Sequence, residues 1–163
     1  MSLMTHGPVR PIGKLIYIVA LPYLILHGYF ARKPRVRVLI RHDNEILLVK
    51  NWLSTQSWSL PGGGIHHNES SLSAAHREIE EEFGITLESD PILLFEAPSP
   101  ESTTKFRIEL FSITVDAKPK VTIDGFEIID YRWVNIEELN AIATPKLYEL
   151  VKTATVVTHE NTR

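Results

Sequence analysis

The sequence predicts an α/β (α+β) fold in which helices flank a mixed β-sheet. Stretches rich in β-branched and other apolar residues stand before and after one helical segment near the middle of the chain. Further helical segments follow towards the C-terminal end. With 163 residues, the chain has the length of one domain that buries a substantial core.

Two strands joined by a tight turn are expected first. Residues 35–41 (RVRVLIR) and 45–50 (EILLVK) have strand composition, and residues 42–44 (HDN) supply the turn between them. A loop then leads into a short strand at 57–60 (SWSL), which ends at Pro61 and three glycines. The pattern predicts a hairpin followed by a glycine-rich loop.

The central helix is expected over residues 70–83. Ser70 is a suitable N-cap, and Gly84 stands where a C-terminal cap glycine belongs. The remaining elements expected are strands at 91–97, 105–115 and 131–134, a helix that begins at Asn135 or Ile136, and a last helix over 145–156.

Composition excludes several classes of protein. The apolar fraction of 44% and the charged fraction of 23% are those of a globular protein, not of a disordered or fibrous one. The formal net charge of −3 gives no general nucleic-acid signature. The chain has no cysteine, which rules out disulfides, thiolate metal sites and thiol catalysis.

The N-terminal part of the chain contains an apolar run from Leu15 to Leu26. The run includes Pro22 and is shorter than the roughly 20 apolar residues of a spanning helix. We expect an N-terminal apolar helical segment over 1–31, docked on the main domain or on a second subunit. Attachment to a membrane surface through residues 15–37 and a cleaved signal peptide are the alternatives. The main domain is expected over 32–158, with a frayed tail at 159–163.

The most unusual feature is the stretch GGGIHHNESSLSAAHREIEEEFGI, residues 62–85, which has four glutamates in five positions. At about 100° per helical residue, Glu78, Glu81 and Glu82 fall in one sector, and Glu80 falls on the other side of the apolar stripe. Like charges this close repel one another, and the C-terminal end of a helix disfavours anions. The cluster therefore indicates a missing counter-charge. Oxygen ligands without cysteine favour Mg²⁺, with Mn²⁺ as the second choice.

The spacing in this stretch is specific. Residues 63–85 satisfy the pattern G-x5-E-x7-R-E-U-x-E-E-x-G-U at every defined position, where U is a bulky aliphatic residue. The chain therefore resembles the Nudix hydrolases, and the preceding LPGG and the later YRWV-x-x-EEL are also similar to that family. The resemblance implies a Nudix-type α/β/α sandwich with a mixed central sheet over residues 32–158. It also implies Mg²⁺-dependent hydrolysis of a nucleoside diphosphate linked to another moiety.

The resemblance assigns roles to residues on the helix. Glu78, Glu81 and Glu82 match the family's metal ligands, with Glu81 and Glu78 as the alternatives for the general base, which stays unassigned. Arg77 and Glu69 match the pair that orients the glutamates, and we count both with the catalytic residues.

The resemblance also assigns roles to loop residues. The carbonyl group of Gly62 matches a metal ligand. Gly62 and Gly63 are expected to let the backbone approach the site closely, and Gly63 and Gly64 are expected to bind substrate. A fourth carboxylate often comes from a late loop in this family. Here Glu127 is the preferred candidate, with Asp124 as the alternative.

Other conspicuous side chains have simpler interpretations. His66 and His67 are adjacent on a loop, so we expect solvated or substrate-edge roles rather than metal ligation. Four aromatic residues could stack on a base, although core packing is the preferred interpretation for each. They are Trp52, Trp58, Phe95 and Phe106.

These inferences favour an enzyme that acts on a small nucleotide in the cytoplasm, with peripheral membrane association as an alternative. A nucleic-acid substrate is not expected, because the chain has no obvious basic stripe outside residues 32–37. Two other functions stay open: a non-catalytic Nudix sensor module, and a membrane-surface enzyme that acts on a diphosphate with a lipid portion. A homodimer also stays open.

Overall fold

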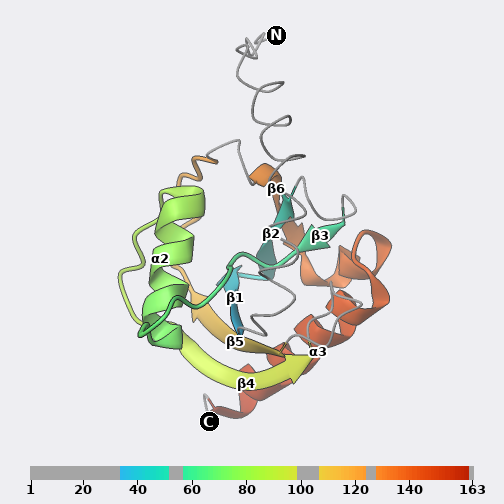
Figure 1. Ribbon diagram of the computed structural model, residues 1–163. Coiled ribbons are helices and arrows are strands. Elements are labelled where there is room, and N and C mark those ends of the chain that lie inside the picture. The colour runs from blue at the N-terminus through green and yellow to red at the C-terminus, as the bar shows by residue number, and fades with distance from the viewer. Residues whose placement is uncertain (1–33, 52–56, 99–106, 124–127, 162–163) are drawn as a thin grey trace, which may run out of the picture. The chain divides into compact units, whose positions relative to one another are not determined.

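The computed structural model describes residues 34–51, 57–98, 107–123 and 128–161 (Figure 1). The chain divides into two compact units, residues 1–32 and 33–163, and every described residue belongs to the second unit. The expected N-terminal apolar segment therefore lies outside the described residues. Among the helices that are described, none is long and apolar enough to cross a membrane.

The elements follow the predicted order. They are β1 (Arg35–His42), β2 (Glu45–Asn51), β3 (Trp58–Ser59), α2 (Ser71–Phe83), β4 (Ile92–Pro98), β5 (Arg107–Thr114), β6 (Ile128–Asn135), the 3₁₀ helix η1 (Ile136–Ala141) and α3 (Pro145–Asn161). Several elements differ from the prediction. β3 is shorter than the SWSL stretch, β6 begins before the expected start at Tyr131, and α3 continues past the expected end at Val156. The helix expected from Asn135 or Ile136 is the short 3₁₀ helix η1.

The sheet is mixed, as predicted. Its strand order is β3-β2-β1-β5-β4, and β6 pairs with β2. β1 and β5 are parallel, whereas the other pairs of neighbours are antiparallel. The parallel pair requires a crossover between β1 and β5, and the chain segment that makes this crossover contains α2.

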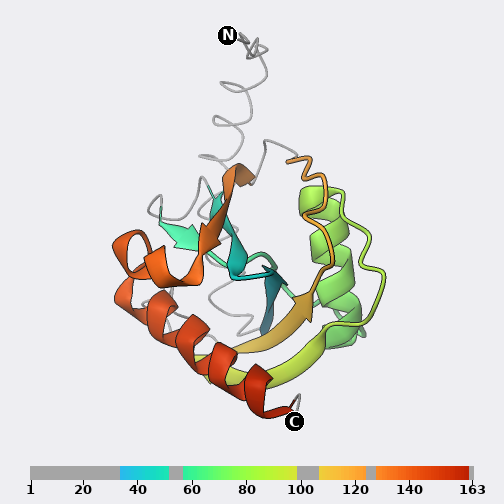
Figure 2. The ribbon, with the colours of Figure 1, turned by 180° about the vertical axis from the view of Figure 1, so that it is seen from behind.

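Each face of the sheet packs against one helix (Figures 1 and 2). Side chains alternate along β1: Val36 and Val38 join the apolar cluster under α2, whereas Leu39 joins the cluster under α3. Ile79 and Phe83 of α2 are fully buried in the first cluster. Burial of side chains of this size stabilises the fold by about 1.5–3 kcal/mol each. The two faces are called the α2 face and the α3 face below.

The sheet opens between β1 and β2. In the described residues these strands pair only near the hairpin turn, at Arg41↔Ile46 and His42↔Glu45. Beyond that point the loop after β3 takes the place beside β1: Val38 N–H donates to the Pro61 carbonyl and Val36 N–H to the Gly63 carbonyl, both at 2.9 Å. The glycine-rich loop is thus fixed inside the sheet rather than on its edge.

Both predicted caps of α2 are confirmed. The Ser70 hydroxyl accepts a hydrogen bond from the Ser73 N–H at 3.0 Å, which satisfies one free donor of the first turn. Gly84 ends the helix with a φ of 64°, and its N–H donates to the Glu80 carbonyl. The caps fix where the helix begins and ends, and hence which way its glutamates point.

Candidate functional site

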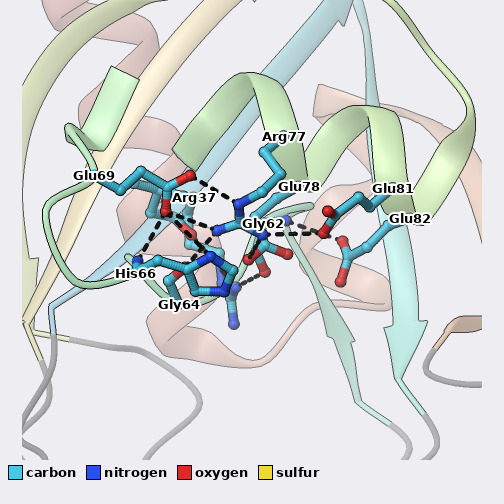
Figure 3. Close-up of polar contacts among 10 residues, drawn as sticks. Arg37, Gly62, Gly64, His66, Glu69, Arg77, Glu78, Glu81 and Glu82 are labelled. Atoms are coloured by element: carbon cyan, nitrogen blue, oxygen red, sulfur yellow. Dashed lines mark hydrogen bonds and ion pairs between the residues drawn. The ribbon is translucent and has the colours of Figure 1, made fainter. Parts of the chain in front are cut away.

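Arg77 stands at the centre of a polar cluster formed by α2 and the loop before it (Figure 3). Its Nε and Nη2 donate to the two carboxylate oxygens of Glu69 at 2.8 and 3.0 Å. Nη2 also donates to the Gly64 carbonyl at 2.9 Å, and Nη1 donates to Glu78 at 2.9 Å and to Glu81 at 3.1 Å. A guanidinium has five N–H donors, so this set of acceptors uses them all.

The three glutamates predicted to bind metal lie in different surroundings. Glu78 is largely buried, with 13% of its side chain exposed, whereas Glu81 is 61% exposed. Glu82 is also buried, and one of its carboxylate oxygens lies 3.4 Å from the Gly62 backbone nitrogen. In Figure 3 Glu81 and Glu82 lie close together on α2, on the side of the loop glycines. Glu80, in contrast, is exposed, as predicted.

At two positions of the loop a side chain would collide with neighbouring atoms, so glycine is required there. Gly62 has a φ of 121°, and a Cβ on it would lie 2.6 Å from the Val36 carbonyl oxygen. A Cβ on Gly63 would lie 2.5 Å from a carboxylate oxygen of Glu78, whereas a Cβ on Gly64 would meet nothing within 4 Å. Gly62 and Gly63 therefore let the loop backbone lie directly against β1 and Glu78.

The charges in the cluster stabilise one another. The hydrogen bonds from Arg77 and, next, from the His66 N–H lower the pKa of Glu69 to about 2. Hydrogen bonding to Glu69 in turn raises the pKa of Arg77 above its usual range. Both groups stay charged at neutral pH, and the loop residue Glu69 is tied to the helix residue Arg77.

Sequence reasoning missed one residue of this site. Arg37 of β1 is 6% exposed, and its Nη1 donates a hydrogen bond to the Gly62 carbonyl oxygen. That carbonyl is the one predicted to bind metal. The available signal was a charged residue at an inward-facing position of the expected strand RVRVLIR.

The donor chemistry of the site suits a hard divalent cation, because the side chains on α2 and the loop backbone offer only oxygen ligands. The carboxylates do not converge, however. Within the described ranges no three acidic or histidine side chains form a ready metal-binding group, because Glu78 and Glu81 are drawn to Arg77 and Glu82 to the Gly62 N–H. Metal ligation by Glu78, Glu81, Glu82 and Gly62 stays a prediction.

The other predicted residues are placed as follows. Glu127 and Asp124 lie outside the described residues, as do Trp52 and Phe106. The His66 N–H donates to Glu69 at 2.8 Å, so the backbone of His66 helps to hold the loop. Trp58 and Phe95 pack against the apolar cluster of the α3 face, in line with the preferred interpretation.

The chain matches a known protein family. The family model described as "NUDIX domain" matches residues 31–154. An RNA pyrophosphohydrolase from Ruthia magnifica subsp. Calyptogena magnifica is 41% identical over 66 residues, which are 40% of this chain and 35% of that protein. Nudix hydrolase 8 from Arabidopsis thaliana is 29% identical over 104 residues, 61% of this chain and 28% of that protein. The chain thus spans about a third of the length of these curated relatives.

Solved structures show the same fold. The MutT protein from Methanosarcina mazei Go1 superposes with a TM-score of 0.63 at 23% identity, over 80% of this chain and 96% of that one. A C. elegans Ap4A hydrolase in a binary complex superposes with a TM-score of 0.67 at 18% identity, over 78% of this chain and 98% of that one. At these identities the likeness concerns the arrangement of strands and helices alone.

Proposed function

The chain belongs to the NUDIX domain family, and from that premise we propose that it hydrolyses the diphosphate linkage of a nucleoside diphosphate derivative. Water attacks one phosphorus, and the products are a nucleoside monophosphate and the phosphorylated second moiety. One observation carries the proposal most directly: Arg77 donates hydrogen bonds to Glu78 and Glu81 of α2, while Glu82 of the same helix lies against the backbone N–H of Gly62.

A bound divalent cation, Mg²⁺ first and Mn²⁺ second, would stabilise the charge on the diphosphate and lower the pKa of the attacking water. Glu78, Glu81, Glu82 and the Gly62 carbonyl are the groups that would hold it. The chemistry of these donors supports this assignment, since all of them are oxygens. Glu127 is the further carboxylate that we assign to the site.

Arg77 and Glu69 act as positioning residues in this proposal. Arg77 donates to one oxygen of Glu78 and one oxygen of Glu81, which leaves the second oxygen of each carboxylate for a cation or a proton. Because Glu69 and Gly64 accept the other N–H groups of Arg77, the guanidinium is held in place by the loop. A rotation of Arg77 would release both glutamates together.

The exposed position of Glu81 suits proton transfer. Its side chain is 61% exposed, so an attacking water can reach it from solvent, whereas Glu82 is buried against the loop. We therefore assign the general base to Glu81, whose second oxygen takes the proton when it does not hold the cation, and a purely ligating role to Glu82. A general base contributes on the order of 10²–10⁴ to the rate, and a Glu81→Gln variant should lose that much of kcat.

The test is a panel of nucleoside diphosphate derivatives assayed with Mg²⁺. We expect at least one compound to yield a nucleoside monophosphate, and Glu82→Gln to slow that reaction by about 10² or more. Glu80→Gln is the matched control, because Glu80 lies on the same helix but faces solvent. No product from any compound, or equal rates for the wild type and Glu82→Gln, would contradict the proposal.

The RNA pyrophosphohydrolases among the relatives favour a second candidate substrate, the 5′ end of an RNA. The same panel separates the two substrates when it includes a 5′-triphosphorylated oligoribonucleotide. A higher kcat/KM for the oligonucleotide than for every mononucleotide would establish the RNA end as the substrate. The reverse order would establish the small nucleotide.

A further inference from the structure

A buried arginine of the sheet contacts the glycine loop. Arg37 of β1 is 6% exposed, and its Nη1 donates to the Gly62 carbonyl oxygen and, at 3.5 Å, to the Val36 carbonyl oxygen. A guanidinium has only donors and does not lose its proton in proteins. The Gly62 carbonyl oxygen is therefore in contact with a permanent positive charge.

The N–H and the carbonyl group of Gly62 have partners of opposite charge (Figure 3). The N–H donates to a carboxylate oxygen of Glu82 at 3.4 Å, whereas the carbonyl oxygen accepts from Arg37. Glu82 and the Gly62 carbonyl are both groups that we assign to the divalent cation. Of these two ligands, only the carbonyl is held by a cationic side chain from outside the sequence motif at 63–85.

Backbone hydrogen bonds fix the loop beside this arginine. The N–H groups of the residues on either side of Arg37 donate to the carbonyl groups of the residues on either side of Gly62, both at 2.9 Å. A Cβ on Gly62 would lie 3.2 Å from the Arg37 Cα, so the two backbones are in direct contact. The loop cannot leave Arg37 without breaking these bonds, whereas the guanidinium can leave the carbonyl by rotation of its own side chain.

A divalent cation would need the same carbonyl oxygen. With ordinary metal–oxygen and hydrogen-bond lengths, a cation on one lone pair would lie about 4–5 Å from a nitrogen bound to the other lone pair. Two positive charges at that separation repel strongly where water is largely excluded, as it is around a side chain as buried as Arg37. The guanidinium and the cation therefore disfavour each other at the Gly62 oxygen.

We propose that Arg37 competes with the divalent cation for the Gly62 carbonyl oxygen, so that the guanidinium leaves this oxygen when the cation binds there. The inference rests on the proposed function, because it takes Gly62 and Glu82 as ligands. It adds a residue of β1, outside the motif, that lowers the affinity of the site for metal. Arg37 thus acts as a positioning residue through the Gly62 carbonyl.

The test measures binding of Mn²⁺ alone by isothermal titration calorimetry and by the electron paramagnetic resonance signal of free Mn²⁺. Arg37→Met replaces the guanidinium with an uncharged side chain that suits a buried position. We expect this variant to bind Mn²⁺ about 10-fold more tightly than the wild type, because binding no longer breaks a hydrogen bond from a charged group. Arg37→Lys keeps the charge beside the loop and should stay within about 3-fold of the wild type.

Arg41→Met is the matched control. Arg41 lies on the same strand, four residues or about 13 Å farther along, and strand alternation directs its side chain to the same face as that of Arg37. This variant loses the same charge and should bind Mn²⁺ within about 2-fold of the wild type, since salt screens charges at that distance. Equal gains in both methionine variants would reveal a general effect of charge and would overturn the competition.

A second measurement uses the wild type and so does not depend on the folding of a variant. In crystals of the full chain soaked with Mg²⁺, we expect the cation on the Gly62 oxygen and Arg37 Nη1 beyond hydrogen-bond distance from it. A cation on that oxygen with the Arg37 hydrogen bond intact would overturn the proposal. Weaker Mn²⁺ binding by Arg37→Met would also overturn it, because the guanidinium would then support the ligand.

Glu82→Gln separates this inference from the proposed function. We expect this variant to bind Mn²⁺ more weakly than the wild type. If it does so while Arg37→Met binds Mn²⁺ like the wild type, the metal site stands and the competition fails. The proposed function itself is decided by the rate of Glu82→Gln on the substrate panel, which does not depend on Arg37.

Discussion

Arg77 and Glu69 form a two-pronged ion pair, with Nε to Oε1 at 2.8 Å and Nη2 to Oε2 at 3.0 Å. The pair joins the loop that follows the glycines to the helix that carries the acidic cluster. Both side chains are mostly buried, with 20% of Arg77 and 14% of Glu69 exposed. Paired donors on a planar guanidinium fix orientation as well as distance, so the loop and the helix are held in one geometry.

Arg77→Lys should impair the enzyme even though it keeps the positive charge. A lysine ammonium has three donors and no planar fork, so it cannot serve the two oxygens of Glu69, the Gly64 carbonyl, Glu78 and Glu81 together. We expect kcat/KM to fall by about 10- to 100-fold, as for other residues that orient ligands. Steady-state kinetics on the wild type and the variant measure this loss.

Arg107→Lys is the control for that experiment. Arg107 also forms an ion pair, with Glu96, but 72% of its side chain is exposed and it lies away from α2, on β5. An exposed pair contributes little, so its variant should keep the wild-type kcat/KM. A loss of equal size in both lysine variants would show that the geometry around Arg77 has no special role.

Glu69→Gln should change how stability depends on pH. The folded-state pKa of Glu69 is about 2, below the ordinary value of 4.5, so the ionised carboxylate favours the folded state above about pH 4.5. That contribution is lost as the pH falls from about 4.5 to about 2, because the unfolded chain takes up the proton first. The difference in unfolding free energy between wild type and Glu69→Gln should therefore shrink across this window.

Urea unfolding at pH 7, 4.5 and 3 checks this prediction. Glu88→Gln, which removes an exposed carboxylate outside the cluster, provides the comparison. A constant difference between the wild type and Glu69→Gln at all three pH values would mean that the ion pair with Arg77 does not depress the pKa.

Gly63→Ala and Gly64→Ala form a matched pair of substitutions. A methyl group at Gly63 would lie 2.5 Å from a carboxylate oxygen of Glu78, so Glu78 must move away from the loop, whereas a methyl group at Gly64 meets nothing within 4 Å. We expect Gly63→Ala to lower kcat by about 10-fold or more, since small misplacements of catalytic groups are costly. Gly64→Ala should keep kcat and the melting temperature. Similar kcat values for the two variants would contradict the expectation that a methyl group at residue 63 displaces Glu78.

Mg²⁺ should stabilise the folded protein through the carboxylates of α2. A ligand at 100 times its Kd adds about 2.7 kcal/mol to the stability of the folded state. Thermal unfolding with EDTA and with increasing Mg²⁺ should therefore show a rising melting temperature in the wild type and in Glu80→Gln, and a clearly smaller rise in Glu82→Gln. Identical shifts in all three proteins would place the cation elsewhere.

Local spacing in the sequence predicted a large part of the site. The helix over Ser71–Phe83, its two caps and the common side of Glu78, Glu81 and Glu82 follow from a period of 3.6 residues and from the residues at the helix ends. The pairing of Arg77 with Glu69 was expected from the family pattern and is confirmed by the contacts. These features depend on residues within one short stretch of chain.

Only the tertiary structure could determine the features that depend on contacts between residues distant in the sequence. The opening between β1 and β2 and the contact of Arg37 with Gly62 arise from strand register. A shift by one residue in any of these pairings would turn each side chain to the other face. The sequence therefore determined the chemistry on the helix, whereas the sheet determined that Arg37 of β1 contacts the Gly62 carbonyl of the loop beside it.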